Sequence, residues 1–269
     1  METGSWTGDR TYSEVRGLSR GLAVLRAMNR APGGLASTTT VARACGIHRT
    51  TAKRLLETLR SEGLVRQAER DGLYRLTFGV RQLSEGFEDE AWVAQVASPL
   101  MHAAVGELMW PCDLCTAVAG DMVVRESTHR WSMLSQHRAM VGTRLPIMTT
   151  AVGRAYLAAC NVRERQAVVD LLAQRQDHVG ELARERTYVA RVMAQTRRRG
   201  HAINEGEMPG DRDFAAVAVP LHAAGRLVGA MNVVFPKGAC SQREATRRFV
   251  PPLRRLALSI GKASAEFFC

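Results

Sequence analysis

The chain has 269 residues, with a hydrophobic fraction of 46% and a charged fraction of 23%, which is ordinary for a globular protein of one or two domains. No apolar run reaches the roughly 18 residues that a membrane span needs, and the N-terminus METGSWTGDR lacks a signal peptide's apolar segment, so we expect a cytoplasmic protein without a membrane partner. The net charge of +11 favours a polyanionic partner.

In chain order, the first predicted element is a helix from Ser19 to Ala31, which Pro32-Gly33-Gly34 ends. Two short helical patterns follow within TTTVARACGIHRTTAKRLLETLR, residues 38–60, and Gly46 supplies a sharp turn between them. A short helix held by a glycine turn against a second helix is typical of a DNA-binding helix-turn-helix.

The second of these helices has two faces of different character. Its apolar residues recur at i, i+3, i+4 and i+7, which predicts that they face the core: Ala52, Leu55, Leu56 and Leu59. Its opposite face is basic and polar: Arg49, Thr50, Lys53, Arg54 and Arg60. We expect Arg49, Thr50, Lys53 and Arg54 to enter the major groove.

A hairpin is predicted after this helix. Gly63 suits the left-handed cap that ends a helix, and LVRQAERDGLYRLTF then holds two short alternating runs around Arg70-Asp71-Gly72. Three helices and a basic hairpin predict a winged helix-turn-helix domain over residues 12–78. Between Arg16 and Arg81 the sequence has 13 Lys and Arg residues against four acids, so this quarter of the chain carries +9 of the net charge.

This coincidence of basic charge and motif predicts contacts with double-stranded operator DNA. The candidate DNA-binding residues lie in the helix-turn-helix and in the hairpin, whose arginines would contact the backbone or the minor groove. They are Thr38, Thr39, Thr40, His48, Arg49, Thr50, Thr51, Lys53, Arg54, Arg66, Arg70 and Arg75.

A second domain follows the hairpin. Residues 79–92 are predicted to start a linker helix, whose apolar pattern continues from Val93 to Leu108. From residue 93 to residue 269, strand-like segments (LCTAVAG, MVVRES, FAAVAVPLHAAGRLVGAMNVVF) alternate with helical ones (TAVGRAYLAAC, ERQAVVDLLAQR, TYVARVMAQTRRRG, FVPPLRRLALSIGKASAEFF). Antiparallel hairpins with helices on their faces predict an α+β domain.

The pair Cys112 and Cys115 has the spacing of zinc ligands or of a redox motif. No second closely spaced cysteine pair accompanies it, and LCTAVAG reads as a strand rather than as a helix start. We therefore favour two buried thiols over a metal or redox site.

Enzyme signatures are missing from the sequence. It holds no G-x-S-x-G elbow, no P-loop, no G-x-G-x-x-G after a strand and no H-E-x-x-H, and Cys160 lies inside an apolar helical pattern. We therefore expect no catalytic residues, no cofactor and no metal. The alternatives are an enzyme with an added DNA-binding domain and an architectural DNA-binding protein.

Several ordered motifs resemble the IclR family of bacterial transcriptional regulators over nearly the whole chain. They are VRGLSRGLAVL, VARACGIHRTTAKRLLETLRSEGLV, YRLTFGVRQLSEGF, VGTRLPIMTTAVGRAYLA and FAAVAVPLHAAGRLVGAMNVV. The resemblance implies a winged-helix N-terminal domain, a GAF-like effector-binding domain, and a homodimer or a dimer of dimers. The segments WPCDLCTAVAGDMVVRESTHRW and LSQHRAMVGTRLP resemble members that activate 3-(3-hydroxyphenyl)propionate catabolism.

That resemblance implies a small aromatic carboxylic acid as effector and, for an activator, RNA polymerase as a partner. The alternative is a repressor that responds to a different organic acid. In many members a cysteine and two serines line the effector pocket; their positions fall here at Ala216, Asn232 and Val234, and an acidic position falls near Glu205. These departures make the pocket less polar, which fits a larger, partly aromatic ligand.

The effector carboxylate is expected at a helix start near Ala151, Val152 and Gly153, because unpaired N–H groups there suit an anion. Pro146 ends an extended run before it, and Thr149 or Thr150 caps the helix. Met148, Ala216, Met231 and Val234 are expected to wall the aromatic ring, Asn232 to bond a phenolic hydroxyl, and His129 and Arg130 to be further candidates for the carboxylate.

Overall fold

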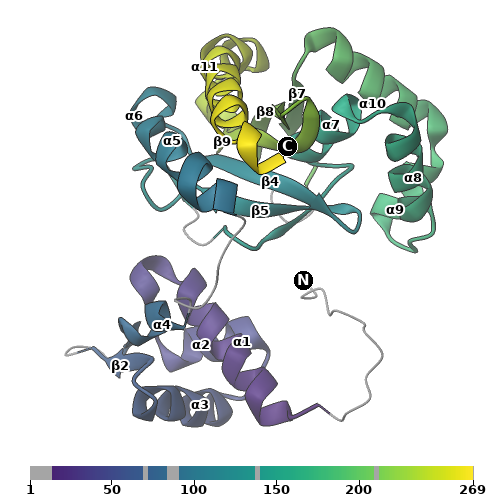
Figure 1. Cartoon of the computed structure of the whole chain (residues 1–269). Helices are drawn as coiled ribbons and strands as arrows, with labels where there is room; N and C mark the ends of the chain where they lie inside the picture. The colour runs from purple at the N-terminus through teal and green to yellow at the C-terminus, as the bar shows by residue number, and fades with distance from the viewer. Residues whose placement is uncertain (1–13, 69–71, 84–90, 137–139, 209–211, 269) are drawn as a thin grey trace. The chain divides into compact units, whose positions relative to one another are not determined.

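The structure is a computed structural model that describes residues 14–68, 72–83, 91–136, 140–208 and 212–268. The chain divides into two compact units, Met1–Glu88 and Asp89–Cys269 (Figure 1).

The N-terminal unit is a winged helix-turn-helix. Its helices are α1 (Arg16–Arg30), η1 (Pro32–Gly34), α2 (Thr38–Cys45), α3 (Arg49–Ser61) and α4 (Gly79–Gln82). Its strands β1 (Leu35–Ala36), β2 (Val65–Gln67) and β3 (Tyr74–Leu76) form an antiparallel sheet in the order β1-β3-β2. The core joins residues of all three main helices to the sheet: Val24, Met28, Ala36, Val41, Ala42, Ala52, Leu56, Val65 and Tyr74.

Local signals fix the ends of these helices. Ser37 caps α2 by accepting a hydrogen bond from the Thr40 N–H over 3.1 Å. Gly46 follows α2 at φ 63° and Gly63 follows α3 at φ 72°, a left-handed backbone that glycine adopts without strain. Both glycine turns were predicted and are confirmed.

The C-terminal unit is built on a six-stranded sheet in the order β6-β5-β4-β9-β8-β7, and every neighbouring pair is antiparallel. The strands are β4 (Cys112–Val118), β5 (Asp121–Ser127), β6 (Arg144–Pro146), β7 (Ala202–Glu205), β8 (Phe214–Ala223) and β9 (Arg226–Pro236). The helices are η2 (Val93–Ala97), α5 (Ser98–Ala103), α6 (Val105–Leu108), α7 (Ala151–Ala159), α8 (Val162–Ala173), α9 (His178–Arg184), α10 (Arg186–Arg199), η3 (Lys237–Ala239), α11 (Gln242–Ala263) and η4 (Ala265–Phe268).

The sheet separates two cores. On one face α11, η2 and α5 cover Cys112, Leu114 and Met231. On the other face α7 packs on β8 and β9 over Cys115 and Ala230, and α8, α9 and α10 pack beside it (Figure 1). Because successive strand residues point to opposite faces, this division decides which side chains reach the α7 face.

The predicted linker stretch packs inside its own unit. Trp92, Val93, Ala97, Met101 and Leu108 are all buried in the α11-side core. The helical pattern is interrupted, because Val93–Ala97 forms a π-helical turn and Ala104 separates α5 from α6. The helix predicted from Val93 to Leu108 is confirmed, and its buried apolar residues pack inside the C-terminal unit. Most of the predicted start of the linker helix, residues 84–90, lies outside the described residues.

The α+β architecture predicted for the second domain is confirmed, with some boundaries corrected. Strands β4, β5, β8 and β9 and helices α7, α8 and α10 lie where predicted, and the extended run predicted to end at Pro146 is β6. Helix α9 and strand β7 were missed. Helix α11 begins at Gln242 instead of Phe249, because Ser241 caps it with a hydrogen bond from the Glu244 N–H over 3.3 Å.

Candidate DNA-binding and effector-binding sites

Helix α3 presents a polar face to solvent. Ala52 and Leu56 are buried against the core, as predicted, while Arg49, Thr50 and Arg54 are exposed. The guanidinium groups of Arg49 and Arg54 are therefore accessible on the second helix of this motif.

The first turn of α3 is held by His48. This residue caps the helix by accepting a hydrogen bond at Nδ1 from the Thr50 N–H, over 3.4 Å, and the same nitrogen lies 2.8 Å from Thr50 Oγ1. Both residues are exposed, whereas Thr51 is half-buried. In α2, Thr39 and Thr40 are exposed in the first turn and Thr38 is buried.

Lys53 is engaged within the protein. Its ammonium donates a hydrogen bond to the Tyr74 hydroxyl over 2.5 Å and lies 2.9 Å from Glu57 Oε1. Tyr74 in turn donates its hydroxyl hydrogen to Glu57, and these partners lower the pKa of the Glu57 carboxyl to about 2. This arrangement differs from the expected role of Lys53 as a base reader, because its charge already has a carboxylate partner.

The two wing strands place like charges opposite one another. Arg66 on β2 and Arg75 on β3 are direct cross-strand partners, and both are exposed. Like charges in directly opposed positions repel in the free protein, and a polyanion relieves that repulsion. Arg70, the third wing candidate, lies outside the described residues.

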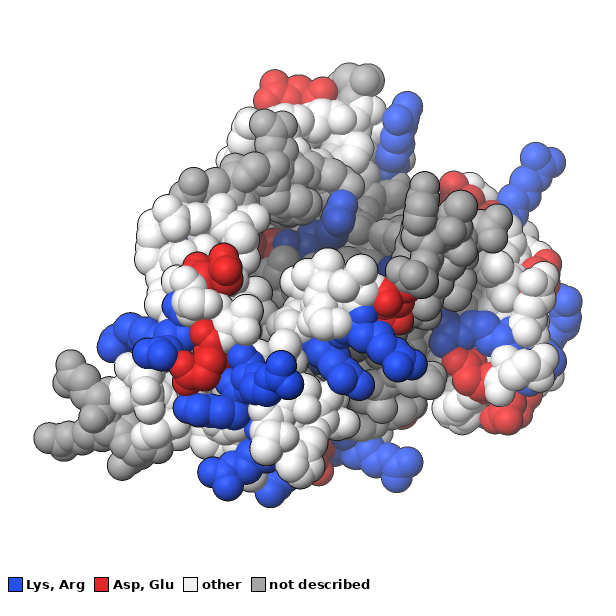
Figure 2. Space-filling model, turned by 90° about the horizontal axis from the view of Figure 1, so that it is seen from below, with Lys and Arg blue, Asp and Glu red and all other residues white. Residues whose placement is uncertain are grey.

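Figure 2 shows the face of the molecule seen from below, where Lys and Arg side chains cover more of the surface than acidic ones. The exposed basic residues of the N-terminal unit include Arg49, Arg54, Arg66 and Arg75. The N-terminal unit thus joins an exposed helix face to positive charge, as the sequence predicts for a DNA-binding surface.

A cavity of about 60 Å³ lies in the C-terminal unit, between the sheet and the start of α7. Most of its wall is apolar, and its polar groups come from the sheet, from Thr150 and from His129 in the turn after β5. The residues that line it are Asp113, His129, Met140, Leu145, Thr150, Ala151, Asn204, Met208, Phe214, Ala215, Ala216, Asn232 and Val234. An apolar cavity with a few convergent polar groups is the usual form of a ligand site.

Three polar residues lie in register across β5, β4 and β9, and two of them, Asp113 and Asn232, form the sheet side of the cavity, its floor. Asp113 on β4 is paired with Ser127 on β5 and with Asn232 on β9, and all three are buried. The Ser127 hydroxyl donates to Asp113 Oδ1 over 2.7 Å, and the Asp113 N–H donates to Asn232 Oδ1 over 2.9 Å. We call Ser127, Asp113 and Asn232 the polar row.

His129 stands at the end of this row. Its Nε2 lies 3.7 Å from Asp113 Oδ1, its Nδ1 lies 2.6 Å from the Ser135 hydroxyl, and its side chain is buried. The other carboxylate oxygen, Asp113 Oδ2, is buried and has no hydrogen-bond partner among the residues that the structure describes. The floor therefore holds a buried anionic group with spare accepting capacity.

The start of α7 forms the facing wall. Thr150 caps the helix by accepting a hydrogen bond from the Gly153 N–H over 3.3 Å, and its hydroxyl donates to the Pro146 carbonyl over 2.8 Å. The predicted cap and helix start at Ala151 are thus confirmed. Thr149 Oγ1, one residue earlier, is buried without a hydrogen-bond partner in the described part of the chain.

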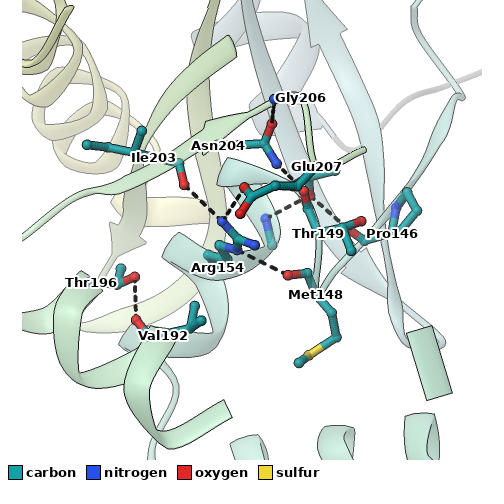
Figure 3. Close-up of polar contacts among 12 residues, drawn as sticks. Pro146, Met148, Thr149, Arg154, Val192, Thr196, Ile203, Asn204, Gly206 and Glu207 are labelled. Atoms are coloured by element: carbon teal, nitrogen blue, oxygen red, sulfur yellow. Dashed lines mark hydrogen bonds and ion pairs between the residues drawn. The ribbon is translucent and has the colours of Figure 1, made fainter. Parts of the chain in front are cut away.

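Arg154 holds this helix start in place. The buried guanidinium donates to the carbonyls of Met148 and Ile203, each over 3.1 Å, and to Glu207 over 2.6 Å (Figure 3). It also donates to the Tyr188 hydroxyl over 2.9 Å. These bonds tie the β6–α7 turn to β7 and α10. A fixed α7 start is a prerequisite for a site that uses its N–H groups.

Six of the predicted effector residues line the cavity: His129, Thr150, Ala151, Ala216, Asn232 and Val234. Three others, Met148, Thr149 and Val152, are buried near the α7 start but do not line the cavity. Arg130 is exposed over the Trp131 ring, and Glu205 is exposed on β7 and lines a separate polar cavity.

Two predicted roles need correction. Met231 cannot wall this cavity, because it alternates with Asn232 along β9 and packs in the α11-side core. Gly153 is small for a structural reason: a Cβ there would come within 2.0 Å of the Ile147 carbonyl oxygen. Glycine is needed here because the backbone at Ile147 packs directly against it.

The sequence interpretation missed Asp113, Asn204 and several apolar wall residues. Asp113 had a readable signal, because a carboxylate between apolar residues of a strand is rarely buried without a purpose. Asn204 had none, since it belongs to a strand that was not predicted. Its side chain donates to the Thr149 carbonyl and accepts from the Gly206 N–H over 3.1 Å (Figure 3).

Cys112 and Cys115 are buried on opposite faces of the sheet, and burial raises the pKa of both thiols well above its ordinary value. No group of three or more metal-ligating side chains occurs among the described residues. Within that same part of the chain, none of the helices combines the length and apolar character of a membrane span.

Comparison with known proteins identifies both units. Residues 17–69 match the IclR helix-turn-helix domain, and residues 89–262 match the C-terminal domain of bacterial transcriptional regulators of the IclR type.

Individual relatives resemble the chain over nearly its whole length. The Pca regulon regulatory protein of Pseudomonas putida is 26% identical over 93% of this chain and 83% of its own. The p-hydroxybenzoate hydroxylase transcriptional activator of Acinetobacter baylyi is 24% identical over 92% and 91%. A crystal structure of an IclR homolog from Microbacterium hydrocarbonoxydans, complexed with 4-hydroxybenzoate, is 21% identical, covers 93% of this chain and 99% of that one, and has a TM-score of 0.59.

Proposed function

The chain belongs to the IclR family of bacterial transcriptional regulators, and from that premise we propose that it controls an operon for aromatic-acid catabolism, as an activator. The N-terminal unit binds operator DNA and the C-terminal unit binds the effector. The observation that carries the effector proposal is the cavity between the polar row and the α7 start.

On the DNA side, Arg49, Thr50 and Arg54 of α3 read bases in the major groove. Arg66 and Arg75 contact phosphates, because their cross-strand repulsion makes an anion between them favourable. Lys53 orients α3 through Tyr74 and Glu57. The exposed Thr39 and Thr40, at the start of α2, complete the phosphate contacts.

On the effector side, the ligand carboxylate lies at the α7 start, beside Thr150 and Ala151. The aromatic ring lies between Ala216 and Val234, and its hydroxyl points to the polar row at Asn232. This orientation follows from charge, because Asp113 repels a carboxylate while the helix N-terminus attracts one.

Two of the relatives described above, the Acinetobacter baylyi activator and the Microbacterium hydrocarbonoxydans homolog, have a hydroxylated benzoate in their names, which supports an effector of this class. We favour an arylpropionate such as 3-(3-hydroxyphenyl)propionate, on the sequence resemblance given above. A benzene ring needs a cavity of about 150 Å³. Since the cavity here holds about 60 Å³, the Met140, Met208 and Phe214 side chains must move apart when the effector binds.

We further propose that the protein works in the cytoplasm as a homodimer or a dimer of dimers and, as an activator, contacts RNA polymerase. Helix α1 and Val15, the residue before it, carry the surface for self-association, because Val15, Leu18 and Leu22 are spaced about one turn apart and are exposed. The second candidate function is a repressor of the same family that responds to another organic acid.

The proposal is tested with purified full-length protein, operator DNA and a panel of aromatic and aliphatic acids. A thermal-shift screen should show stabilisation by hydroxylated aromatic acids, because a ligand that binds only the folded state raises its melting temperature. A promoter-transcription assay then decides the sign of regulation. Chemical turnover of a stabilising acid, or stabilisation by aliphatic acids alone, contradicts the proposal.

A further inference from the structure

Asp113 is the least expected residue of the cavity floor. Its side chain is 1% exposed and lies on the central strand β4, between two apolar cores. Burying a carboxylate is costly unless its oxygens accept hydrogen bonds. An energetically poor residue at such a position indicates a role beyond packing.

The two oxygens of Asp113 differ in their surroundings. Oδ1 accepts a hydrogen bond from the Ser127 hydroxyl over 2.7 Å and lies 3.7 Å from His129 Nε2. Oδ2 is buried and has no hydrogen-bond partner among the described residues. The Ser127 bond fixes the carboxylate plane, and the residue lines the cavity.

The rest of the polar row holds the carboxylate in this position. The Asn232 side chain accepts a hydrogen bond from the Asp113 backbone N–H over 2.9 Å. This bond adds to the pairing of β4 with β9 at the position of the carboxylate. The Ser127 hydroxyl also accepts a hydrogen bond from the His129 backbone N–H over 3.3 Å. This bond holds Ser127 in the position from which it donates to Asp113 Oδ1. A rigid acceptor with one free oxygen fits a ligand that supplies one O–H or N–H.

From this geometry we infer that Asp113 accepts a hydrogen bond from the effector's hydroxyl group and thereby selects hydroxylated aromatic acids over analogues that lack the hydroxyl. The inference rests on the proposed function and names the part of the site that sets its specificity. A binding site built to hydrogen-bond a hydroxyl discriminates strongly, because the analogue leaves its buried acceptor unpaired. Hydrogen bonds to charged groups correspond to roughly 10- to 100-fold in affinity.

The test is calorimetry on the full-length protein with acids that differ only at the hydroxyl. The pairs are 3-(3-hydroxyphenyl)propionate with 3-phenylpropionate and 4-hydroxybenzoate with benzoate, and 3-(3-methoxyphenyl)propionate adds an oxygen that cannot donate. The variants are wild type, Asp113→Asn and the control Asp170→Asn, which removes an exposed carboxylate on α8. Thermal unfolding and operator binding verify that each variant is folded.

Wild type and Asp170→Asn should bind the hydroxylated member of a pair at least about tenfold more tightly. Asp113→Asn should lose most of that preference and tolerate the methoxy compound better, because its amide donates where the carboxylate accepted. The inference is overturned if wild type binds both members of each pair equally, or if Asp113→Asn keeps the full preference. A wild type that binds operator DNA but none of these acids overturns the aromatic effector as well, and this outcome separates the two claims.

Discussion

Tyr74 on β3 donates its hydroxyl hydrogen to Glu57 on α3, and Lys53 on the same helix donates to the Tyr74 oxygen over 2.5 Å. The tyrosine ring is fully buried in the N-terminal core, so its hydroxyl joins the wing to the candidate recognition helix at one fixed point. Replacing Tyr74 by phenylalanine keeps the ring and removes only this junction.

We expect Tyr74→Phe to lower the free energy of unfolding of the N-terminal unit by about 0.5–1.5 kcal/mol, the usual contribution of a hydrogen bond. Hydrogen exchange should show faster opening of α3 and β3 and unchanged exchange in the C-terminal unit. The control is Tyr188→Phe, whose hydroxyl accepts from Arg154 in the other unit. Unchanged exchange in α3 in the Tyr74 variant would refute the junction.

Base reading is tested at Arg49 and Arg54, which are both exposed on α3. Each change to alanine should cost about 1–3 kcal/mol of operator binding and relax specificity at one base pair. Arg60→Ala is the matched control, because that arginine lies on the same helix with its guanidinium 2.7 Å from Glu57. Fluorescence anisotropy with operator and scrambled DNA measures both quantities. Equal losses on both DNAs would reassign these residues to phosphate contacts.

Replacing one wing arginine should stabilise the free protein and weaken its binding to DNA. Arg75→Gln removes the repulsion from Arg66 and should stabilise the free protein by a few tenths of a kcal/mol to about 1 kcal/mol. The same change should weaken binding to all DNA sequences alike and reduce the slope of log K against log salt by about 1. Arg226→Gln, an exposed arginine on β9, is the control. An unchanged salt slope would exclude the phosphate contact.

Self-association is tested on α1. Val15, Leu18 and Leu22 are 69%, 63% and 44% exposed, whereas the apolar residues of the linker stretch are buried in their own unit. We therefore expect Leu18→Glu with Leu22→Glu to reduce the oligomer by at least one step, measured by light scattering at micromolar concentration. Leu258→Glu changes an equally exposed leucine on α11 and should leave the assembly intact. A monomeric wild type removes the claim.

The sequence predicted what depends on local chemistry. Periodicity located α3 and its buried Ala52 and Leu56, and glycines marked both turns of the helix-turn-helix. The start of α7 was predicted from a cap at Thr149 or Thr150, and Thr150 is the cap in the structure, because capping involves only neighbouring residues. These features need no knowledge of the tertiary structure.

The cavity could be predicted only in part, because it depends on which strands are neighbours. Asp113, Ser127 and Asn232 are distant in sequence and become a row through the register of β5, β4 and β9. The prediction that Asn232 and Met231 line one pocket was wrong, because side chains alternate along β9. In the structure Met231 and Asn232 lie on opposite faces of the sheet. Lys53 was likewise predicted to contact DNA, because the sequence does not show that Tyr74 on β3 lies beside it.

The last prediction concerns the α7 wall of the cavity. Ala151 is 2% exposed and lines the cavity, so Ala151→Phe fills a space of about 60 Å³ that the effector's carboxylate end must enter. We expect calorimetry to detect no binding of 3-(3-hydroxyphenyl)propionate, while affinity for operator DNA stays unchanged because the substitution lies in the other unit. Ala151→Val should give an intermediate loss, since it adds less volume.

Overpacking costs typically 1–3 kcal/mol of stability, so thermal unfolding must first show that the Ala151→Phe protein is folded. Val162→Phe, at an exposed position that starts α8, is the matched control and should bind the effector like wild type. If the folded Ala151→Phe protein binds the effector as tightly as wild type, the carboxylate does not lie at the α7 start. The ligand must then bind outside this cavity, because the phenylalanine ring and an aromatic acid cannot both occupy it.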